Sequence, residues 1–347
     1  MLLSLRRSRR YLIPIVALSL LGAACGSDDD GDEASGDAAG TVIVSGSSTV
    51  EPISSLVADF LAEENDGVEV TVDGPGTGDG FKLFCDGETD ISDASRAIKP
   101  EEAAACEANG IEFIELKVAF DGLTVMTNTD NDIECLSFAD LYALVGPEST
   151  AARWPDAATL AAELGSDTTF PDKDLTIVAP GEESGTYDSF IELALAGIAE
   201  ERVEAGKLTE EQAGSTRADY QASANDNVII EGMADDGSFG WVGFAFAEEA
   251  GDSVREIAVS EEPGGDCVAP SAETISDGSY PLARPLFIYV NKAKAEENEA
   301  VAAYVDYYLS DSGLAAVAEA GYVDLDEASL EETQTAWTDR TVGSRES

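Results

Sequence analysis

Four short loops in this chain carry side chains that could bind an anion. Each follows an apolar stretch expected to be a strand, and each is rich in Ser, Thr or Gly: SGSST (45–49), GTGDG (76–80), SDASR (92–96) and ESGT (183–186). Three of the loops open predicted helices, whose first turns offer free backbone N–H groups and a partial positive charge. Hydroxyl groups add donors, and Gly lets an anion approach the backbone. The candidate oxyanion ligands are Ser47, Ser48, Thr49, Thr77, Gly78, Ser95, Ser184, Gly185 and Thr186.

Arg96 adds a planar set of donors that suits phosphate or carboxylate. Each of these features also has an ordinary structural interpretation. A Ser or Thr before a helix is commonly an N-cap, and a lone Arg commonly forms a surface ion pair. The loop GPGTGDG fits neither established phosphate-loop spacing and is commonly a turn. The prediction of an anion site therefore rests on the recurrence of such loops after strands.

The residues most often used for catalysis are missing. The chain contains no His, which excludes His-based triads, His general bases and His metal ligands. It also contains no Ser-x-x-Lys spacing, the other common arrangement that activates a Ser. We therefore expect a binding protein and not an enzyme, with no cofactor and no metal site.

The 347 residues carry a strongly acidic balance. Lys and Arg number 19 against 70 Asp and Glu, a formal net charge of −51. Such a field repels nucleic acid and anionic lipid, so neither is expected as a partner. An anion can still be held at short range by neutral dipoles and one Arg, because salt screens the distant acidic groups within about 8–10 Å.

The N-terminus is predicted to be a targeting segment. Residues 1–24 have a basic start, an apolar run too short to span a membrane, and small residues before Cys25, which indicates a signal peptide. The sequence LGAAC is similar to a lipoprotein cleavage box and predicts lipidation of Cys25. An ordinary secreted protein is the alternative, and SRRYLI leaves twin-arginine export open. Residues 25–40 are polar and acidic, which predicts a lipid-anchored flexible tether.

The other cysteines are even in number, as expected for disulfides in an exported chain. They are Cys85, Cys106, Cys135 and Cys267. Of the three connectivities, we favour Cys85–Cys106, whose members are close in sequence, with Cys135–Cys267. A four-cysteine metal site is the alternative, but no C-x-x-C pair is present.

Strand, polar loop and helix alternate along the chain, which predicts a parallel α/β architecture. Two strong strand patterns, near 118–127 and 280–290, could carry the chain between two lobes. The first lobe would then comprise 41–124 plus 279–347, and the second 125–278. A cleft between two such lobes is the default position for a ligand.

Six motifs, in this order, resemble the phosphate-binding protein of the high-affinity phosphate ABC transporter: SGSSTVEP, SDASRAI, VAFDGLTVMTN, ESGTYDSF, GSFGWVGFAFAEE and ARPLFIYVNK. The resemblance covers nearly all of 41–325. It implies a type II periplasmic-binding-protein fold with a dehydrated phosphate between two lobes. It also implies a monomeric, lipid-anchored receptor on the extracytoplasmic face of the cell membrane, which touches the membrane only through its lipid and delivers inorganic phosphate to ABC permease subunits.

Two positions depart from the family pattern. Many members have an Arg four residues before the Ser-Gly-Thr motif, where this chain has Pro180. Many also have an Asp that accepts the phosphate proton, at the position we align with Ser95. The resemblance therefore suggests Arg96 as the replacement cation. Asp93 is a candidate proton acceptor, with a structural cap as the alternative.

Three other functions stay open at this point. A receptor for another oxyanion, such as sulfate or molybdate, would be separated by ligand competition. An exported phosphatase-like hydrolase using Ser184 would turn over a phosphate ester. A surface adhesion or signalling protein with a vestigial cleft would bind no small anion.

Overall fold

A computed structural model describes residues 38–345. The predicted signal peptide (1–24), the predicted lipidation site Cys25 and the tether as far as residue 37 lie outside the described residues. In the described part, no helix is long and apolar enough to cross a membrane.

The described residues form a nine-stranded sheet with the order β2-β1-β3-β11-β4-β8-β6-β7, in which β9 also pairs with β4, and a two-stranded sheet of β5 and β10. The strands are β1 (Gly40–Gly46), β2 (Val68–Asp73), β3 (Ile91–Ala94), β4 (Phe113–Thr127), β5 (Cys135–Ser137), β6 (Thr176–Ala179), β7 (Gln221–Ala222), β8 (Ser238–Gly243), β9 (Arg255–Glu256), β10 (Ala258–Ser260) and β11 (Ala283–Asn291). Strands β1, β2 and β3 are parallel, whereas β11 is antiparallel to both β3 and β4.

The helices of the first half are α1 (Glu51–Glu64), α2 (Thr77–Cys85), α3 (Pro100–Ala108), α4 (Phe138–Val145), η1 (Trp154–Ala157), α5 (Ala158–Glu163) and α6 (Gly185–Phe190). They continue with η2 (Ile191–Leu195), α7 (Ala196–Glu204), α8 (Glu210–Ala213), α9 (Asp226–Gly232), α10 (Phe244–Ala250) and η3 (Gly251–Ser253). The last are α11 (Ala272–Ser276), α12 (Lys292–Glu297), α13 (Glu299–Tyr308), α14 (Asp311–Glu319) and α15 (Glu327–Thr338). Segment η2 is a π-helical stretch, so α6, η2 and α7 follow one another without a loop.

One set of cores surrounds β1, β2, β3 and part of β11. Apolar side chains of α1, α13, α14 and α15 pack on one face of these strands, and those of α2 and α3 pack on the other. The side chains in these cores lie between 42 and 119 or between 286 and 337. We call this part the first lobe.

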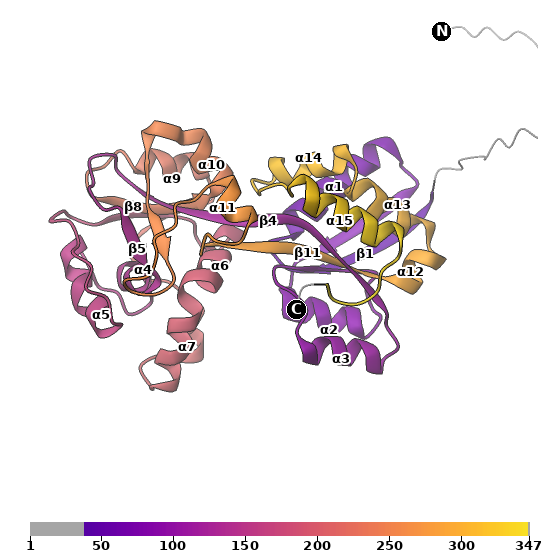
Figure 1. The fold of residues 1–347 in the computed structure, drawn as a ribbon, viewed down its shortest axis with the longest axis horizontal. Coiled ribbons are helices and arrows are strands. Elements are labelled where there is room, and N and C mark those ends of the chain that lie inside the picture. The colour runs from indigo at the N-terminus through magenta and orange to yellow at the C-terminus, as the bar shows by residue number, and fades with distance from the viewer. Residues whose placement is uncertain (1–37, 346–347) are drawn as a thin grey trace, which may run out of the picture. The chain divides into compact units, whose positions relative to one another are not determined.

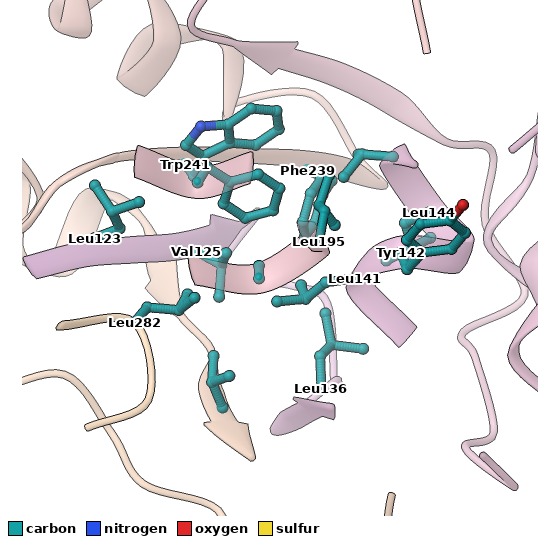
Figure 2. Close-up of a cluster of buried hydrophobic side chains, with 14 of the residues drawn as sticks. Leu123, Val125, Leu136, Leu141, Tyr142, Leu144, Leu195, Phe239, Trp241 and Leu282 are labelled. Carbon is teal, nitrogen blue, oxygen red and sulfur yellow. The ribbon is translucent and has the colours of Figure 1, made fainter. Parts of the chain in front are cut away.

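A second set of cores is built from residues between 120 and 282, which we call the second lobe. Figure 2 shows its centre, where Leu123 and Val125 of β4 lie among side chains of α4, η2 and β8, including Leu141 and Trp241. The aromatic ring of Trp241 stacks on Phe190 with centroids 4.1 Å apart. Phe190, the last residue before η2, is thus packed within the second lobe.

Strands β4 and β11 pass between the two lobes (Figure 1). Both were predicted as chain crossings, from strong strand patterns that could carry the chain to the second lobe and back. The cores change over between Ala119 and Phe120 on β4, and between Leu282, just before β11, and Leu286 on β11. Both positions are near the predicted boundaries at 124/125 and 278/279, and the exact extent of each lobe stays a prediction.

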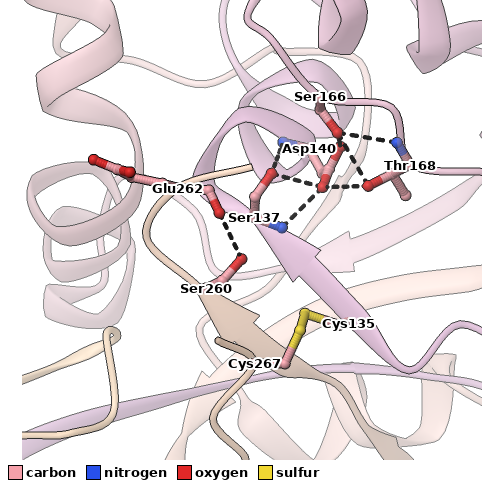
Figure 3. Close-up of a disulfide and its surroundings, with 8 residues drawn as sticks. All are labelled: Cys135, Ser137, Asp140, Ser166, Thr168, Ser260, Glu262 and Cys267. Atoms are coloured by element: carbon pink, nitrogen blue, oxygen red, sulfur yellow. Dashed lines mark hydrogen bonds between the residues drawn. A yellow bond between two sulfur atoms is a disulfide. The ribbon is translucent and has the colours of Figure 1, made fainter. Parts of the chain in front are cut away.

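The favoured disulfide pairing is confirmed. Cys85 on α2 is joined to Cys106 on α3, and Cys135 is joined to Cys267 across 132 residues of sequence. The second disulfide lies beside the two-stranded sheet of β5 and β10 (Figure 3). It closes a long loop of sequence within the second lobe, which restricts the unfolded chain.

Candidate functional site

The loop after β1 brings two of the predicted ligands to the second lobe and holds the third in the turn that precedes α1. The Ser47 hydroxyl accepts the backbone N–H of Thr49 at 3.2 Å, so Ser47 stabilises the first turn leading into α1. Ser48 Oγ donates to Asp188 Oδ2 of the second lobe at 3.3 Å. Thr49 Oγ1 lies 3.3 Å from Ser189 Oγ, also in the second lobe.

The predicted ligands after β2 and β3 meet one another. Thr77, the first residue of α2, accepts the backbone N–H of Ser95 at 3.2 Å, and the two hydroxyls are 3.1 Å apart. Gly78 has space above it, since an added Cβ atom would find only a guanidinium nitrogen of Arg96, at 4.0 Å. These four residues therefore form one polar group at the edge of the first lobe.

Ser184, Gly185 and Thr186 of the second lobe lie beside the loop that follows β1. Ser184 caps α6 by accepting the backbone N–H of Thr186 at 3.2 Å. A Cβ atom on Gly185 would lie 3.5 Å from the carbonyl oxygen of Ser48. The Ser-Gly-Thr motif thus lies against the loop that carries Ser48.

Arg96 is held by an acidic partner. Its Nη1 and Nη2 atoms both donate to the Glu102 carboxylate at 2.8 Å, and its guanidinium lies 5.5 Å from the centre of the Phe81 ring. The pKa of Arg96 is raised, chiefly by the hydrogen bonds to Glu102, although burial opposes the rise. The charge of Glu192 in the second lobe makes a smaller contribution to the rise.

A second arginine, Arg284 on β11, was not predicted to be in the site. Its Nη2 atom donates to Thr49 Oγ1 at 3.2 Å and to Ser189 Oγ at 2.8 Å, so it contacts both lobes. Its Nη1 atom donates to the Glu192 carboxylate, and its Nε atom donates to Asp121 Oδ2 at 3.3 Å. The signal in the sequence was an arginine in the apolar strand ARPLFIYV, where a charge is costly unless it is paired.

The group around Thr77 and both arginines line a cleft of about 860 Å³ between the lobes, whereas the Ser48 loop and the Ser-Gly-Thr motif are outside its lining and are connected to it through Arg284. Its lining joins the first-lobe group to η2 and α7 of the second lobe and to the crossing strand β11. The polar residues that line it are Thr77, Asp79, Ser95, Arg96, Lys99, Glu192, Glu200 and Arg284. The two arginines therefore face the same space.

Three carboxylates of different character lie near Arg284. Asp121 is the cross-strand partner of Arg284, with only 3% of its side chain exposed. Burial raises the pKa of Asp121, and Arg284 partly offsets the rise. Burial also raises the pKa of Asp188, while Glu192 keeps 56% of its side chain exposed.

Asp93 lies elsewhere. Its side chain is fully buried, and Oδ1 accepts the Ser54 hydroxyl at 3.0 Å within the core beneath α1. Burial raises the pKa of Asp93 to about 7, although the Ser54 hydrogen bond lowers it. The proton-acceptor role stays a prediction, and these surroundings argue against direct contact between Asp93 and an anion in the cleft.

The site has the features of a binding site. Among the described residues, no group of three or more His, Cys, Asp or Glu could hold a metal ion. The two lobes present hydroxyls, two arginines and several carboxylates to each other, among them Asp188 and Glu192. Two lobes joined by crossing strands around such a cleft define a solute-binding protein.

Comparisons with known proteins agree with this class. Residues 31–312 match the model of the PBP superfamily domain. Protein SphX from Synechocystis sp. is 37% identical over 93% of this chain and 87% of its own length. The phosphate-binding protein PstS from Staphylococcus saprophyticus is 32% identical over 93% of this chain and 92% of its own.

A solved structure shows the same likeness. The crystal structure of a possible phosphate binding protein from Planctomyces limnophilus is 34% identical, with a TM-score of 0.77, and the match covers 88% of this chain and 99% of that one. The chain therefore belongs to the PBP superfamily and, within it, to the family that contains the phosphate-binding protein PstS and SphX.

Proposed function

We propose that this protein captures inorganic phosphate in the cleft between its lobes and releases it to an ABC permease. The observation that carries the proposal is that hydroxyl groups of both lobes meet at Arg284, which together with Arg96 and the group around Thr77 lines the cleft. Planar guanidinium groups and hydroxyl donors suit a tetrahedral oxyanion. The PstS relatives are named as phosphate-binding proteins, which supports phosphate as that oxyanion.

The ligand set that we propose is the predicted one. Ser48, Thr49 and the group around Thr77 would hold the anion from the first lobe. Ser184, Gly185 and Thr186 would hold it from the second lobe. Ser47 would donate its hydroxyl proton from the loop that carries Ser48, because a hydroxyl that accepts the backbone N–H of Thr49 can still donate.

Movement between the lobes would open and close the site. The lobes, as predicted 41–124 plus 279–347 and 125–278, would turn about β4 and β11, where few residues need to change conformation. The reaction is binding and release alone, so we propose no catalytic role. We further propose a monomer held at the extracytoplasmic face of the membrane by a lipid on Cys25.

Calorimetric titration of the purified protein, stripped of bound anion, tests this function. Phosphate and then excess sulfate would be added at neutral and acid pH. Micromolar or tighter binding of phosphate that sulfate does not disturb is the expected result. Equal binding of both anions would instead indicate a general oxyanion receptor, and binding of neither would contradict the proposal. Turnover of a phosphate ester would revive the hydrolase alternative.

A further inference from the structure

The carboxylate of Glu192 is bound to Arg284 and lines the cleft that Arg96 also lines. It accepts a hydrogen bond from Arg284 Nη1, and its charge contributes to the raised pKa values of both Arg284 and Arg96. Glu192, Arg96 and Arg284 all line the same cleft. A carboxylate and a phosphate oxygen bind the same N–H and O–H donors. A phosphate ion that enters the cleft must therefore compete with Glu192 for Arg284.

The carboxylate of Asp188 occupies the hydroxyl donor of Ser48 in the same way. Asp188 precedes Glu192 by four residues, and its Oδ2 atom accepts the Ser48 hydroxyl at 3.3 Å. The two acidic residues are separated by the start of the π-helical segment η2. Such segments are rare and occur frequently at functional sites.

Unlike Glu192 and Asp188, Asp121 is buried and cannot move away from Arg284. It is buried on β4 opposite Arg284, and it receives the Nε–H of that arginine. Its contact orients the guanidinium and neutralises one charge without using Nη1 or Nη2. Glu192 is half-exposed and can turn into solvent at small cost.

We propose that Arg284 is the cationic anchor of the anion site. In the absence of phosphate, Glu192 occupies a donor of Arg284 and Asp188 occupies the hydroxyl donor of Ser48, and phosphate displaces both carboxylates. This inference rests on the proposed function. It assigns Asp121 as the positioning residue for Arg284. It also explains how a chain with Pro180 at the position of the family's arginine provides a cation for the anion.

The decisive variant is Glu192→Gln, which removes the competing charge and keeps the size of the side chain. Phosphate affinity is expected to rise about tenfold, the size of one charge-assisted hydrogen bond. The matched control is Glu200→Gln, because Glu200 lines the same cleft and the change in net charge is identical. We expect the control to change affinity by less than about twofold. Equal effects of the two variants, or no effect of Glu192→Gln, would overturn the displacement.

Arg284→Gln tests the anchor. It is expected to weaken phosphate binding at least about 100-fold, because a charged donor to both lobes is lost. Wild-type affinity in a folded Arg284→Gln protein would overturn the assignment. If this variant does not fold, Glu192→Gln alone decides the inference, since Glu192 is half-exposed. A wild-type protein that binds no phosphate would instead overturn the proposed function itself.

Discussion

At the scale of single residues, the least expected finding is the surroundings of Asp93. Its Oδ1 atom is paired with Ser54, but its Oδ2 atom has no hydrogen-bond partner within the described residues. The hydroxyls of Tyr304 and Tyr308 lie close by, as their contacts with Ser54 show. Ionisation of this carboxyl is therefore costly, and the protonated form is the one that suits the folded state.

This burial makes stability depend on pH in a definite direction. The pKa of Asp93 rises from 3.8 to about 7 on folding, so the folded state holds the proton more tightly. The stability of the protein should therefore fall as the pH rises from about 4 to about 7, by at most about 4 kcal/mol.

Asp93→Asn should remove this pH-dependent loss of stability. The free energy of unfolding of the variant, relative to that of the wild type, should therefore be larger at about pH 8 than at about pH 5. Urea unfolding of both proteins at the two pH values measures it. Asp59→Asn, an exposed change on helix α1, which carries the Asp93 partner Ser54, is the control and should leave the pH dependence unchanged. Parallel pH profiles of Asp93→Asn and wild type would contradict the account.

The sequence contained the information that places Asp93, but its use requires the strand to be recognised first. Successive side chains of a strand point to opposite faces. Ile91 is buried in the core beneath α1, whereas Ala94 is buried on the α2 side, so Asp93 must share the face of Ile91. Arg284 could be predicted only as a buried arginine that needs partners, because its partners come from distant parts of the chain.

At the scale of elements, the first lobe depends on very close packing between α2 and β1. A Cβ atom on Gly80 of α2 would lie 2.4 Å from the Cα atom of Gly46 and 2.9 Å from the carbonyl oxygen of Ser45. Both contacts are to backbone, so the added atom could be accommodated only by moving the helix. That helix begins at Thr77, which carries one of the proposed ligands.

Gly80→Ala is therefore expected to lower both stability and phosphate affinity. Overpacking of this kind costs about 1–3 kcal/mol of unfolding free energy. Gly197→Ala on α7 is the matched control, because nothing lies within 4 Å of the added atom. It should instead stabilise the protein by roughly 0.5–1 kcal/mol, the helix propensity difference. Thermal unfolding and phosphate titration of both variants measure the effects, and a neutral Gly80→Ala would show that α2 is more adaptable than its packing indicates.

Helices and strands with a strong apolar sequence pattern were predicted well. Local structure that depends on tertiary packing was not. The long apolar run of β4 and the strand β11 follow from the sequence, as does the order of strand, polar loop and helix around Ser48 and Thr77. The predicted helix that follows Pro180 is present, but its π-helical segment η2 has no signal in the sequence. This segment forms where Phe190 and Leu195 pack into the second lobe, which periodicity alone does not reveal.

At the scale of the whole molecule, the net charge is strongly negative, whereas the charges that line the cleft balance. The chain carries a formal charge of −51, but the cleft is lined by Arg96, Lys99 and Arg284 against Asp79, Glu192 and Glu200. The acidic surface acts at long range on an approaching anion, and the site acts only at contact distance. Salt should therefore weaken the repulsion before it weakens the binding contacts.

The association rate of phosphate is expected to increase several-fold as ionic strength rises from about 10 mM to about 200 mM, because the Debye length shortens from about 30 Å to below 10 Å. Stopped-flow fluorescence measures this rate, since Trp241 stacks on Phe190 at the end of the helix that carries Asp188. Potassium gluconate is the suitable salt, because its anion is too bulky to enter the site as phosphate would. The dissociation rate, which is governed by the contacts within the closed cleft, should change far less. An association rate that falls with salt would mean that the positive potential of the two arginines reaches beyond the cleft and dominates the field of the acidic surface.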